Sequence, residues 1–307
     1  MNHFENIIIC IGLNRMDRHL LSYASWLAEK ELAKNFKIIH VLNVRTNIDR
    51  NKAIETIKDY IDEYFLESRD SVDFEIRKGN SLDELLVYLN NHHSDLVIVG
   101  HHSRAGGKRS LARRLAMLSP CSVLMIPDNS TKKVSKILAT TDFSDNSIDT
   151  IDVSSELAFS FGLEDCLVLH VCIDSLNSHY DEHFIEISGV EEKAFLQFFD
   201  RCRRRKNEKR QSSFEADKVN LIPVFVEDSS VANGILKAAK NENCDLIVMN
   251  TRGRSTAASI LLGSDTSQTF MLSSIPILAV KHRGSSMSFI EAIMEKEMWS
   301  NTEPKIN

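Results

Sequence analysis

Two stretches of the chain are near copies of each other, SDLVIVG at residues 94–100 and NCDLIVMN at residues 243–250. In each, an aspartate precedes an unbroken apolar run of the length typical of a buried β-strand. Two further matched pairs follow in the same order along the chain: Ile39-His40-Val41 with Leu169-His170-Val171, and residues 119–126 with residues 273–280. The sequence therefore predicts a tandem duplication.

The length of 307 residues fits two domains of roughly 150 residues each. We expect a first domain over residues 1–128, a short polar linker over 129–135, a second domain over 136–283 and a C-terminal tail over 284–307. In the tail, apolar residues recur at helical spacing, which predicts an amphipathic helix that packs on the body or on a partner.

Within each half, apolar runs alternate with segments of helical period. This alternation predicts an α/β fold, in which each half is a doubly wound, Rossmann-like domain with a five-stranded parallel sheet covered on both faces. Ligands of such sheets bind outside the carboxyl ends of the strands, where the strand order reverses. The expected strands lie near 6–12, 37–44, 71–78, 95–100 and 122–126, and then near 136–140, 166–172, 219–227, 245–250 and 275–280.

Composition narrows the class of protein. A hydrophobic fraction of 43% with 26% charged residues is ordinary for a globular protein and excludes wholesale disorder. The net charge of -6 argues against general nucleic-acid binding. The six cysteines form no C-x-x-C pair, and the first residues lack a signal-peptide pattern. We therefore expect buried, reduced thiols and a cytoplasmic protein.

The first strand of the second half ends in Thr140-Thr141-Asp142-Phe143-Ser144. An aspartate at the carboxyl end of a strand can accept hydrogen bonds from a base or a ribose. Alternatively, Asp142 or Ser144 caps the helix that follows. Both interpretations stay open at this point.

The loop after the fourth strand of the second half reads NTRGRS at residues 250–255, and a helix-like run then leads to Gly263-Ser264-Asp265-Thr266. Glycine permits a close backbone approach, so that amides can point at phosphate oxygens. A glycine-serine pair at a helix start adds N–H groups and a favourable dipole. By themselves, two glycines at this spacing serve tight turns more often than phosphates.

Taken together, these motifs resemble the universal stress protein A family, in a tandem two-domain form. The nucleotide-binding pattern of that family is glycine, two residues, glycine, nine residues, then glycine with serine or threonine. Here Asn250, Gly253 and Gly263-Ser264 stand at those places, so only the first position departs. Asp142 matches the early aspartate of the family, in a T-D-F-S-like motif.

Two further motifs carry the same resemblance. His170-Val171 matches the histidine-valine at the end of the family's second strand. Residues 274–280 match its terminal strand after a short turn, and the likeness extends over nearly the whole chain twice.

The resemblance implies a site in the second half for an adenine nucleotide, ATP or AMP, with or without Mg²⁺. Asp142 would meet the adenine end, Val171 would back the base and Met249 would pack beside the nucleoside. Asp265 would repel a triphosphate unless a metal ion or nearby arginines offset its charge. The predicted nucleotide-binding residues are Thr140, Asp142, Val171, Met249, Asn250, Gly253, Gly263, Ser264, Asp265 and Thr266.

The first half has lost the pattern. Gly12-Leu13-Asn14 replaces the aspartate motif, and Arg113-Arg114 stands where the second half has Gly263-Ser264. We expect this half to bind no ATP in the manner of the family. The resemblance implies that the two domains pair through their last strands, residues 123–126 and 277–280, as a pseudo-dimer; a further homodimer stays open.

Three functions stay open. The first is a binding module with a regulatory or protective role in a stress response, the second a slow ATP hydrolase with a metal at Asp265, and the third a ligand-free interaction scaffold. No general base stands beside the phosphate loop, so we predict no catalytic residue, and we predict no metal site. The basic cluster at residues 201–210 is expected to be a solvated helix end rather than a contact for nucleic acid or a membrane.

Overall fold

A computed structural model describes residues 4–30, 35–43, 49–66, 71–102, 110–173, 182–210, 219–251 and 264–281; within these ranges, the side chains of residues 145, 182–188, 206–210 and 264–266 are not described. The elements of the first half are β1 (Asn6–Ile11), α1 (Met16–Glu29), β2 (Asn35–Leu42), α2 (Arg50–Tyr64), β3 (Val72–Lys78), α3 (Ser81–Asn91), β4 (Leu96–His101), α4 (Leu111–Leu118) and β5 (Ser122–Pro127). The second half has β6 (Ile137–Thr140), α5 (Asp145–Ser160), β7 (Asp165–Ile173), α6 (Glu182–Arg210), β8 (Asn220–Asp228), α7 (Val231–Asn241), β9 (Leu246–Asn250), α8 (Ser264–Leu272) and β10 (Ile277–Val280).

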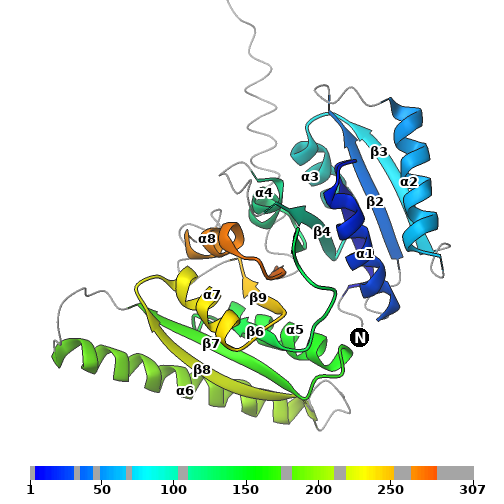
Figure 1. The fold of residues 1–307 in the computed structure, drawn as a ribbon. Helices are drawn as coiled ribbons and strands as arrows, with labels where there is room; N and C mark the ends of the chain where they lie inside the picture. The colour runs from blue at the N-terminus through cyan, green and yellow to red at the C-terminus, as the bar shows by residue number, and fades with distance from the viewer. Residues whose placement is uncertain are drawn as a thin grey trace, which may run out of the picture.

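The described strands form one ten-stranded sheet in the order β3-β2-β1-β4-β5-β10-β9-β6-β7-β8 (Figure 1). Within each half the neighbouring strands are parallel. Each half is therefore a doubly wound α/β unit, as the alternating pattern of the sequence predicts.

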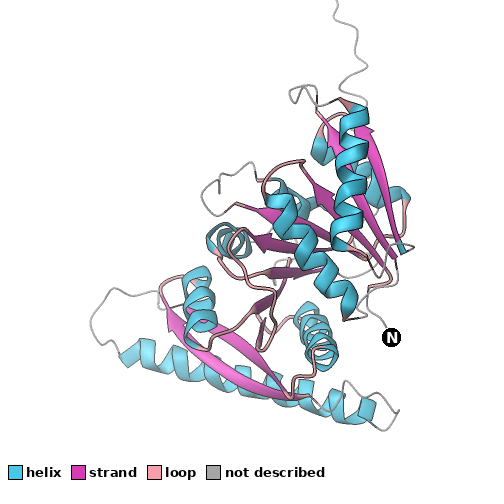
Figure 2. Cartoon of the chain, turned by 45° about the vertical axis from the view of Figure 1, so that its right-hand side comes forward, coloured by secondary structure: helices cyan, strands magenta, loops and turns pink. Residues whose placement is uncertain are grey.

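The apolar strands are explained by helices on both faces of the sheet (Figure 2). Successive residues of a strand point to opposite faces. Accordingly, Ile7 and Ile9 of β1 belong to the core under α1 and α2, whereas Ile8 and Cys10 belong to the core under α3 and α4. A strand buried on both faces has no position at which a polar residue would meet water.

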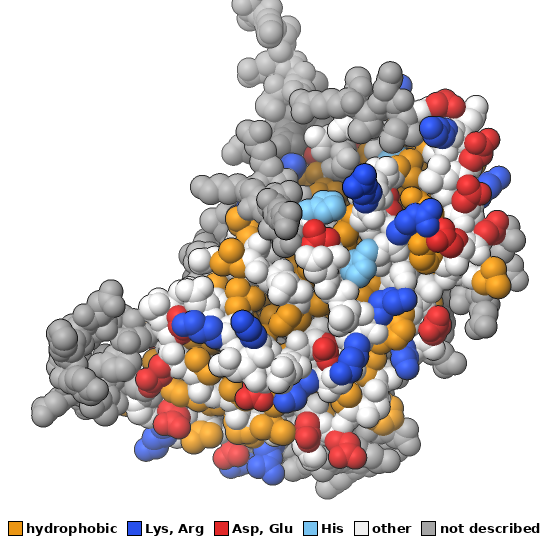
Figure 3. Space-filling view, in the orientation of Figure 1, with side chains coloured by type: hydrophobic (Ala, Val, Ile, Leu, Met, Phe, Trp, Pro, Cys, Tyr) orange, Lys and Arg blue, Asp and Glu red, His pale blue; other side chains and the backbone are white. Residues whose placement is uncertain are grey.

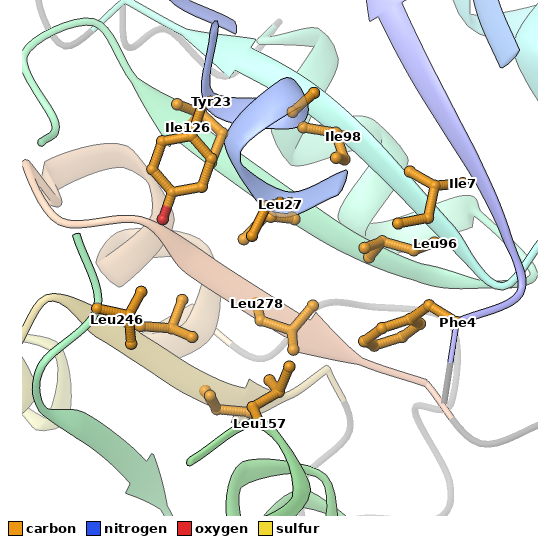
Figure 4. Packing of buried hydrophobic residues seen from close by; sticks show 14 of the residues in the cluster. Phe4, Ile7, Tyr23, Leu27, Leu96, Ile98, Ile126, Leu157, Leu246 and Leu278 are labelled. Atoms are coloured by element: carbon orange, nitrogen blue, oxygen red, sulfur yellow. The ribbon is translucent and has the colours of Figure 1, made fainter. Parts of the chain in front are cut away.

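The two halves share the middle of the sheet. Strands β5 and β10 pair antiparallel, with Leu124 opposite Leu278. Leu278 lies in the same cluster as Leu27 of α1 and Leu157 of α5, so the core continues from one half into the other (Figure 4). The small cavity between them measures about 30 Å³ and is lined almost wholly by apolar side chains.

Polar and aromatic contacts reinforce this junction. The Lys281 Nζ donates to the carbonyl oxygens of Met117 at 2.9 Å and Ser119 at 2.6 Å, and thereby satisfies carbonyls at the end of α4. The rings of Trp26 in α1 and Phe161 after α5 stack with their centroids 5.4 Å apart.

All six cysteines are buried, and none of them forms a disulfide. Burial raises the pKa of the Cys121 and Cys202 thiols to about 11 and that of Cys244 to about 12. These thiols therefore pack as small hydrophobic groups at neutral pH. Within the ranges given above, none of the helices combines the length and the apolar character that a membrane crossing requires.

Candidate functional site

The switch point of the second half lies between β6 and β9. From β6 the chain continues through β7 and β8 on one side, while β9 and β10 lie on the other. Ala139 pairs with Val248, so Thr140, Met249 and Asn250 follow at the same carboxyl edge of the sheet. The structure therefore brings these sequence-predicted residues together with the turn that contains Asp142.

Asp142 organises the turn between β6 and α5. Its Oδ1 accepts hydrogen bonds from the Ser144 amide at 3.1 Å, the Ser144 Oγ at 2.5 Å and the Ser147 Oγ at 2.6 Å. In return, the Asp142 amide donates to the Ser147 Oγ at 3.1 Å. Ser144 occupies the N-cap position of α5 without a side-chain cap bond. Asp142 thus supports the helix entrance, as in the capping interpretation, while staying half-buried at the carboxyl edge.

The charge of Asp142 is stabilised by this arrangement. Burial alone would raise the pKa of its carboxyl group, but hydrogen bonds from the Ser144 and Ser147 hydroxyls outweigh burial, and the pKa lies below its ordinary value. Asp142 is therefore an ionised acceptor at neutral pH.

His170 supports the same turn from the neighbouring strand. Its Nδ1 donates to the Thr141 carbonyl oxygen at 2.9 Å, and its ring lies against Phe143, with centroids 4.1 Å apart. Its Nε2 lies 3.6 Å from the Glu191 Oε2 of α6. The histidine of the sequence motif thus holds the turn in place.

Val171 faces the opposite side of the sheet and is 8% exposed. Helix α7 reaches it through Gly234, because a Cβ at Gly234 would lie only 2.5 Å from the Val171 Cγ1. Met249 is buried in the same core, and Asn250 is half-buried at the end of β9. Val171 and Met249 are therefore buried apolar side chains near the carboxyl edge that Asn250 ends.

The predicted phosphate loop is described only in part. Gly253 and Gly263 lie outside the described residues. Helix α8 begins at Ser264, so the backbone of Ser264, Asp265 and Thr266 forms its first turn. The first four amides of a helix lack intrahelical partners, and the dipole there favours an anion.

The first half builds the equivalent turn with a different carboxylate. Leu13 and Phe143 both adopt positive φ, 54° and 66° respectively. Where the second half uses Asp142, the Asp17 carboxylate of α1 accepts from the Gly12 amide at 3.0 Å and the Asn14 amide at 2.7 Å. The sequence comparison missed Asp17, although an aspartate on an otherwise apolar helix face, five residues after a strand-end glycine, is a usable signal.

Two further first-half residues, which the sequence spacing matches to positions of the nucleotide pattern in the second half, make packing contacts instead. A Cβ at Gly100 would lie 2.7 Å from the Met16 Cγ, so this glycine makes room for a side chain of α1. The Arg113 Nε bonds the Ser267 Oγ of α8, which places this arginine at the junction of the halves.

The basic cluster of residues 201–210 ends α6. Arg201, Arg203, Arg204 and Arg205 are exposed, and the guanidinium of Arg201 lies 5.3 Å from the ring centroid of Phe198. On the face drawn in Figure 3, acidic and basic side chains are interspersed. In the described part of the chain, no group of three or more histidine, cysteine, aspartate or glutamate side chains is arranged to hold a metal ion.

Known proteins share both the sequence and the fold. The profile of the universal stress protein family matches residues 3–127 and again residues 133–281. A universal stress protein of Methanocaldococcus jannaschii is 31% identical over 159 residues, which are 49% of this chain and 96% of that protein.

Two solved structures align over nearly the whole chain. One is a functionally unknown protein from Pseudomonas aeruginosa PAO1, with 15% identity, a TM-score of 0.65, and coverage of 96% of this chain and 98% of that one. The other is a universal stress protein from Archaeoglobus fulgidus, with 15% identity, a TM-score of 0.59, and coverage of 92% and 98%. The chain therefore belongs to the universal stress protein family and carries two copies of the family's domain in tandem.

Proposed function

We propose that the second half binds one adenine nucleotide, ATP or AMP, and that the chain acts in the cytoplasm as a nucleotide-binding regulatory or protective module in a stress response. The observation that carries the proposal is the ionised Asp142 in the turn after β6, at the switch point where Met249 and Asn250 end β9, and the helix start at Ser264 supports it. These three features suit a purine base and its phosphates.

The base would lie against Val171 and Met249, with its polar edge toward Asp142. A carboxylate accepts from an exocyclic amine or a ribose hydroxyl, both of which adenosine offers. Thr140 precedes this turn at the same edge. This arrangement supports recognition of the nucleoside part.

The phosphates would lie at the start of α8, with Asn250 and Gly253 in the loop before it. The pattern of Asn250, Gly253 and Gly263-Ser264 and the amides of the first turn support this assignment. Asp265 and Thr266 stand in that turn. A triphosphate beside Asp265 calls for a divalent cation to offset the repulsion, whereas AMP has less charge to offset.

The first half would serve as the permanent partner of the second, in an intramolecular pseudo-dimer. The antiparallel pairing of β5 with β10 and the Lys281 bonds across the junction support this role. The domain boundaries that we propose are those of the two repeats, 1–128 and 136–283.

The test is a calorimetric titration of ATP and AMP, each with and without Mg²⁺, into the full chain. We expect one site per chain, lost in Gly263→Arg, which places a bulky cation at the glycine of the phosphate pattern. Asn241→Arg is the matched control, because this exposed residue ends α7 at the opposite edge of the sheet. If neither nucleotide produces binding heat in the unsubstituted protein, the result would support the ligand-free scaffold. If ATP releases phosphate when mixed with the protein, the result would support the hydrolase.

A further inference from the structure

The two halves of the chain meet at positions that are equivalent in the repeat. Ser119 after α4 and Ser273 after α8 mark the correspondence, because each Oγ donates to the carbonyl oxygen two residues further on, at 2.6 Å and 2.7 Å respectively. Where β5 pairs with β10, Leu124 lies opposite Leu278, and these two residues correspond by the same separation in sequence. The pseudo-twofold axis that relates the halves therefore passes between Leu124 and Leu278.

Helices α4 and α8 lie side by side next to this axis (Figure 1). The Arg113 Nε of α4 donates to the Ser267 Oγ of α8, and the two residues are 154 positions apart, as Ser119 and Ser273 are. Arg113 therefore corresponds to Ser267, rather than to Gly263, with which the spacing of the nucleotide pattern matches it. One position of the repeat thus meets its own counterpart beside the axis, as an arginine in the first half and as a serine in the second.

This contact distinguishes between possible partners of the first half. In a symmetric pair, a residue beside the axis meets its own copy. Two first halves paired through the same face would therefore place one Arg113 guanidinium against another. Arg113 is half-buried, so that solvent and salt would screen the repulsion only in part. In the chain, by contrast, Arg113 meets the neutral hydroxyl of Ser267, which accepts its hydrogen bond.

The residue that follows β10 adds a second difference between the two kinds of pair. The Lys281 amide donates to the Ser122 Oγ at 3.2 Å. Its Nζ donates to the carbonyl oxygens of Met117 and Ser119 at the end of α4. The first-half counterpart of Lys281 is Pro127, which ends β5 and has neither an amide hydrogen nor a side-chain donor. In a pair of first halves, these acceptors would lose the donors that the second half supplies.

We propose that the face formed by α4 and β5 is specific for a domain of the second-half kind, and that Arg113 and Pro127 prevent the first half from pairing with a copy of itself. A partner that fits this face has a small hydroxyl residue at the place of Ser267 and a cationic donor at the place of Lys281. This specificity rests on the pairing of the halves in the proposed function, and it is independent of nucleotide binding.

The test uses full-length chains with a cysteine beside the axis. Opposite residues of an antiparallel pair have Cα atoms within disulfide range, so Leu124→Cys/Leu278→Cys should form a disulfide within one chain. Leu124→Cys alone links two chains at this position only when two first halves pair. Each variant is unfolded in urea with a reductant, refolded at high concentration so that partners can exchange, and then oxidised with diamide. The linked dimer is measured on a non-reducing gel, with the unsubstituted chain as the background.

Arg113→Ser removes the repulsion beside the axis. We expect Arg113→Ser/Leu124→Cys to give at least ~5-fold more linked dimer than Leu124→Cys, which should stay at the background level. Arg114→Ser/Leu124→Cys is the matched control, because it removes the same charge from the neighbouring half-buried residue, and it should also stay at the background level. Equal yields in the Arg113→Ser and Arg114→Ser chains, or abundant linked dimer in Leu124→Cys alone, would overturn the proposal.

A second measurement reverses the contact within one chain. Ser267→Arg places two arginines beside the axis and should lower the midpoint of thermal unfolding by roughly 4 °C or more. Adding Arg113→Ser leaves a single arginine, now on α8, and should restore at least half of that loss. Gln268→Arg is the control, because it adds the same charge at an exposed residue of α8, and Arg113→Ser should not rescue it.

The outcomes separate this proposal from the proposed function. If Arg113→Ser fails to rescue Ser267→Arg, the specificity assigned to Arg113 is wrong, while the pairing of the halves and the nucleotide site are unaffected. If Leu124→Cys/Leu278→Cys forms no disulfide within the chain, the pseudo-dimer itself is contradicted, and this specificity fails with it. Loss of nucleotide binding alone would contradict only the proposed nucleotide site.

Discussion

Asp17 and Asp142 hold the same turn in the two halves of the chain from different positions of the repeat. Asp142 belongs to the turn itself, at the place that Gly12 takes in the first half. Asp17 reaches back from α1, at the place that Ser147 takes in the second half. The duplicated domain has thus kept the shape of this turn while moving its carboxylate from the edge of the sheet to the helix.

This exchange has opposite consequences for the two carboxyl groups. Burial raises the pKa of Asp17 above its usual value, and the opposing hydrogen bonds from Gly12 and Asn14 do not cancel the effect. For Asp142, hydrogen bonds win over burial and the pKa is lowered. The surroundings therefore favour the charged form of Asp142 and disfavour the charged form of Asp17.

We predict that Asp142→Asn destabilises the protein at pH 7 by roughly 1 kcal/mol, at the low end for bonds to a half-buried charged group. A lowered folded-state pKa contributes stability above the unfolded-state pKa of ~3.9, and this stability is lost as the pH falls through the folded-state pKa. The difference from the unsubstituted protein should therefore shrink between pH 7 and pH 3. Urea unfolding across this range measures it, and a difference that grows toward low pH would contradict the assignment.

Asp17→Asn should show the opposite trend. A raised folded-state pKa contributes stability that is fully present below the unfolded-state pKa and lost as the pH rises through the folded-state pKa. The destabilisation caused by Asp17→Asn should therefore be greatest near pH 3 and smaller at pH 7. The same urea series tests it, since the other titrating groups cancel when each variant is compared with the unsubstituted chain.

Gly234→Ala should destabilise the protein by roughly 1–3 kcal/mol, because the new Cβ would lie 2.5 Å from the Val171 Cγ1 and force α7 away from β7. Nucleotide affinity should fall as well, since Val171 is part of the proposed wall for the base. Gly189→Ala is the matched control: a Cβ at this exposed position of α6 meets nothing within 4 Å. The control should be neutral or slightly stabilising in thermal unfolding, as is usual for glycine to alanine in a helix.

Lys281→Met should weaken the junction of the two halves by roughly 1–2 kcal/mol, because two carbonyl oxygens at the end of α4 lose their cationic donor. Unfolding followed through the fluorescence of Trp26, which stacks on Phe161 across the junction, measures the loss. Lys240→Met, at an exposed residue in the last turn of α7, removes the same charge away from the junction. If both substitutions lower the free energy of unfolding by the same amount, the loss would come from the change in net charge alone, and the prediction would be wrong.

The fold could be predicted from the sequence because the apolar strands repeat in order. The run at residues 243–250, for example, predicts the strand that the structure places at Leu246–Asn250. A strand that is buried on both faces requires apolar side chains at every position, which gives an unbroken apolar run in the sequence. The helices between the strands are recognised by apolar residues at helical spacing. The interpretation of residues 201–210 as the end of a helix likewise follows from the local pattern.

The site could be predicted only in part, because hydrogen bonding depends on which side chains meet in space. The sequence alone left open whether Asp142 caps a helix or faces a ligand, and its bonds to Ser144 and Ser147 show that it organises the helix entrance. The role of Asp17 rests on local bonds to the Gly12 and Asn14 amides, for which the sequence spacing is a usable signal. The incomplete hydrogen bonding of His40, whose buried Nε2 has no partner among the described residues, arises from packing between elements distant in sequence, which no local pattern records.

The central claim, that the nucleotide lies in the second half, is tested most directly by photo-crosslinking with 8-azido-ATP and mapping the labelled peptides. We predict label on peptides that contain residues 140–144, 169–171 or 249–250, with competition by unlabelled ATP and loss of label in Gly263→Arg. Label confined to first-half peptides around residues 12–17 and 40, or no ATP-competable label at all, would contradict the account.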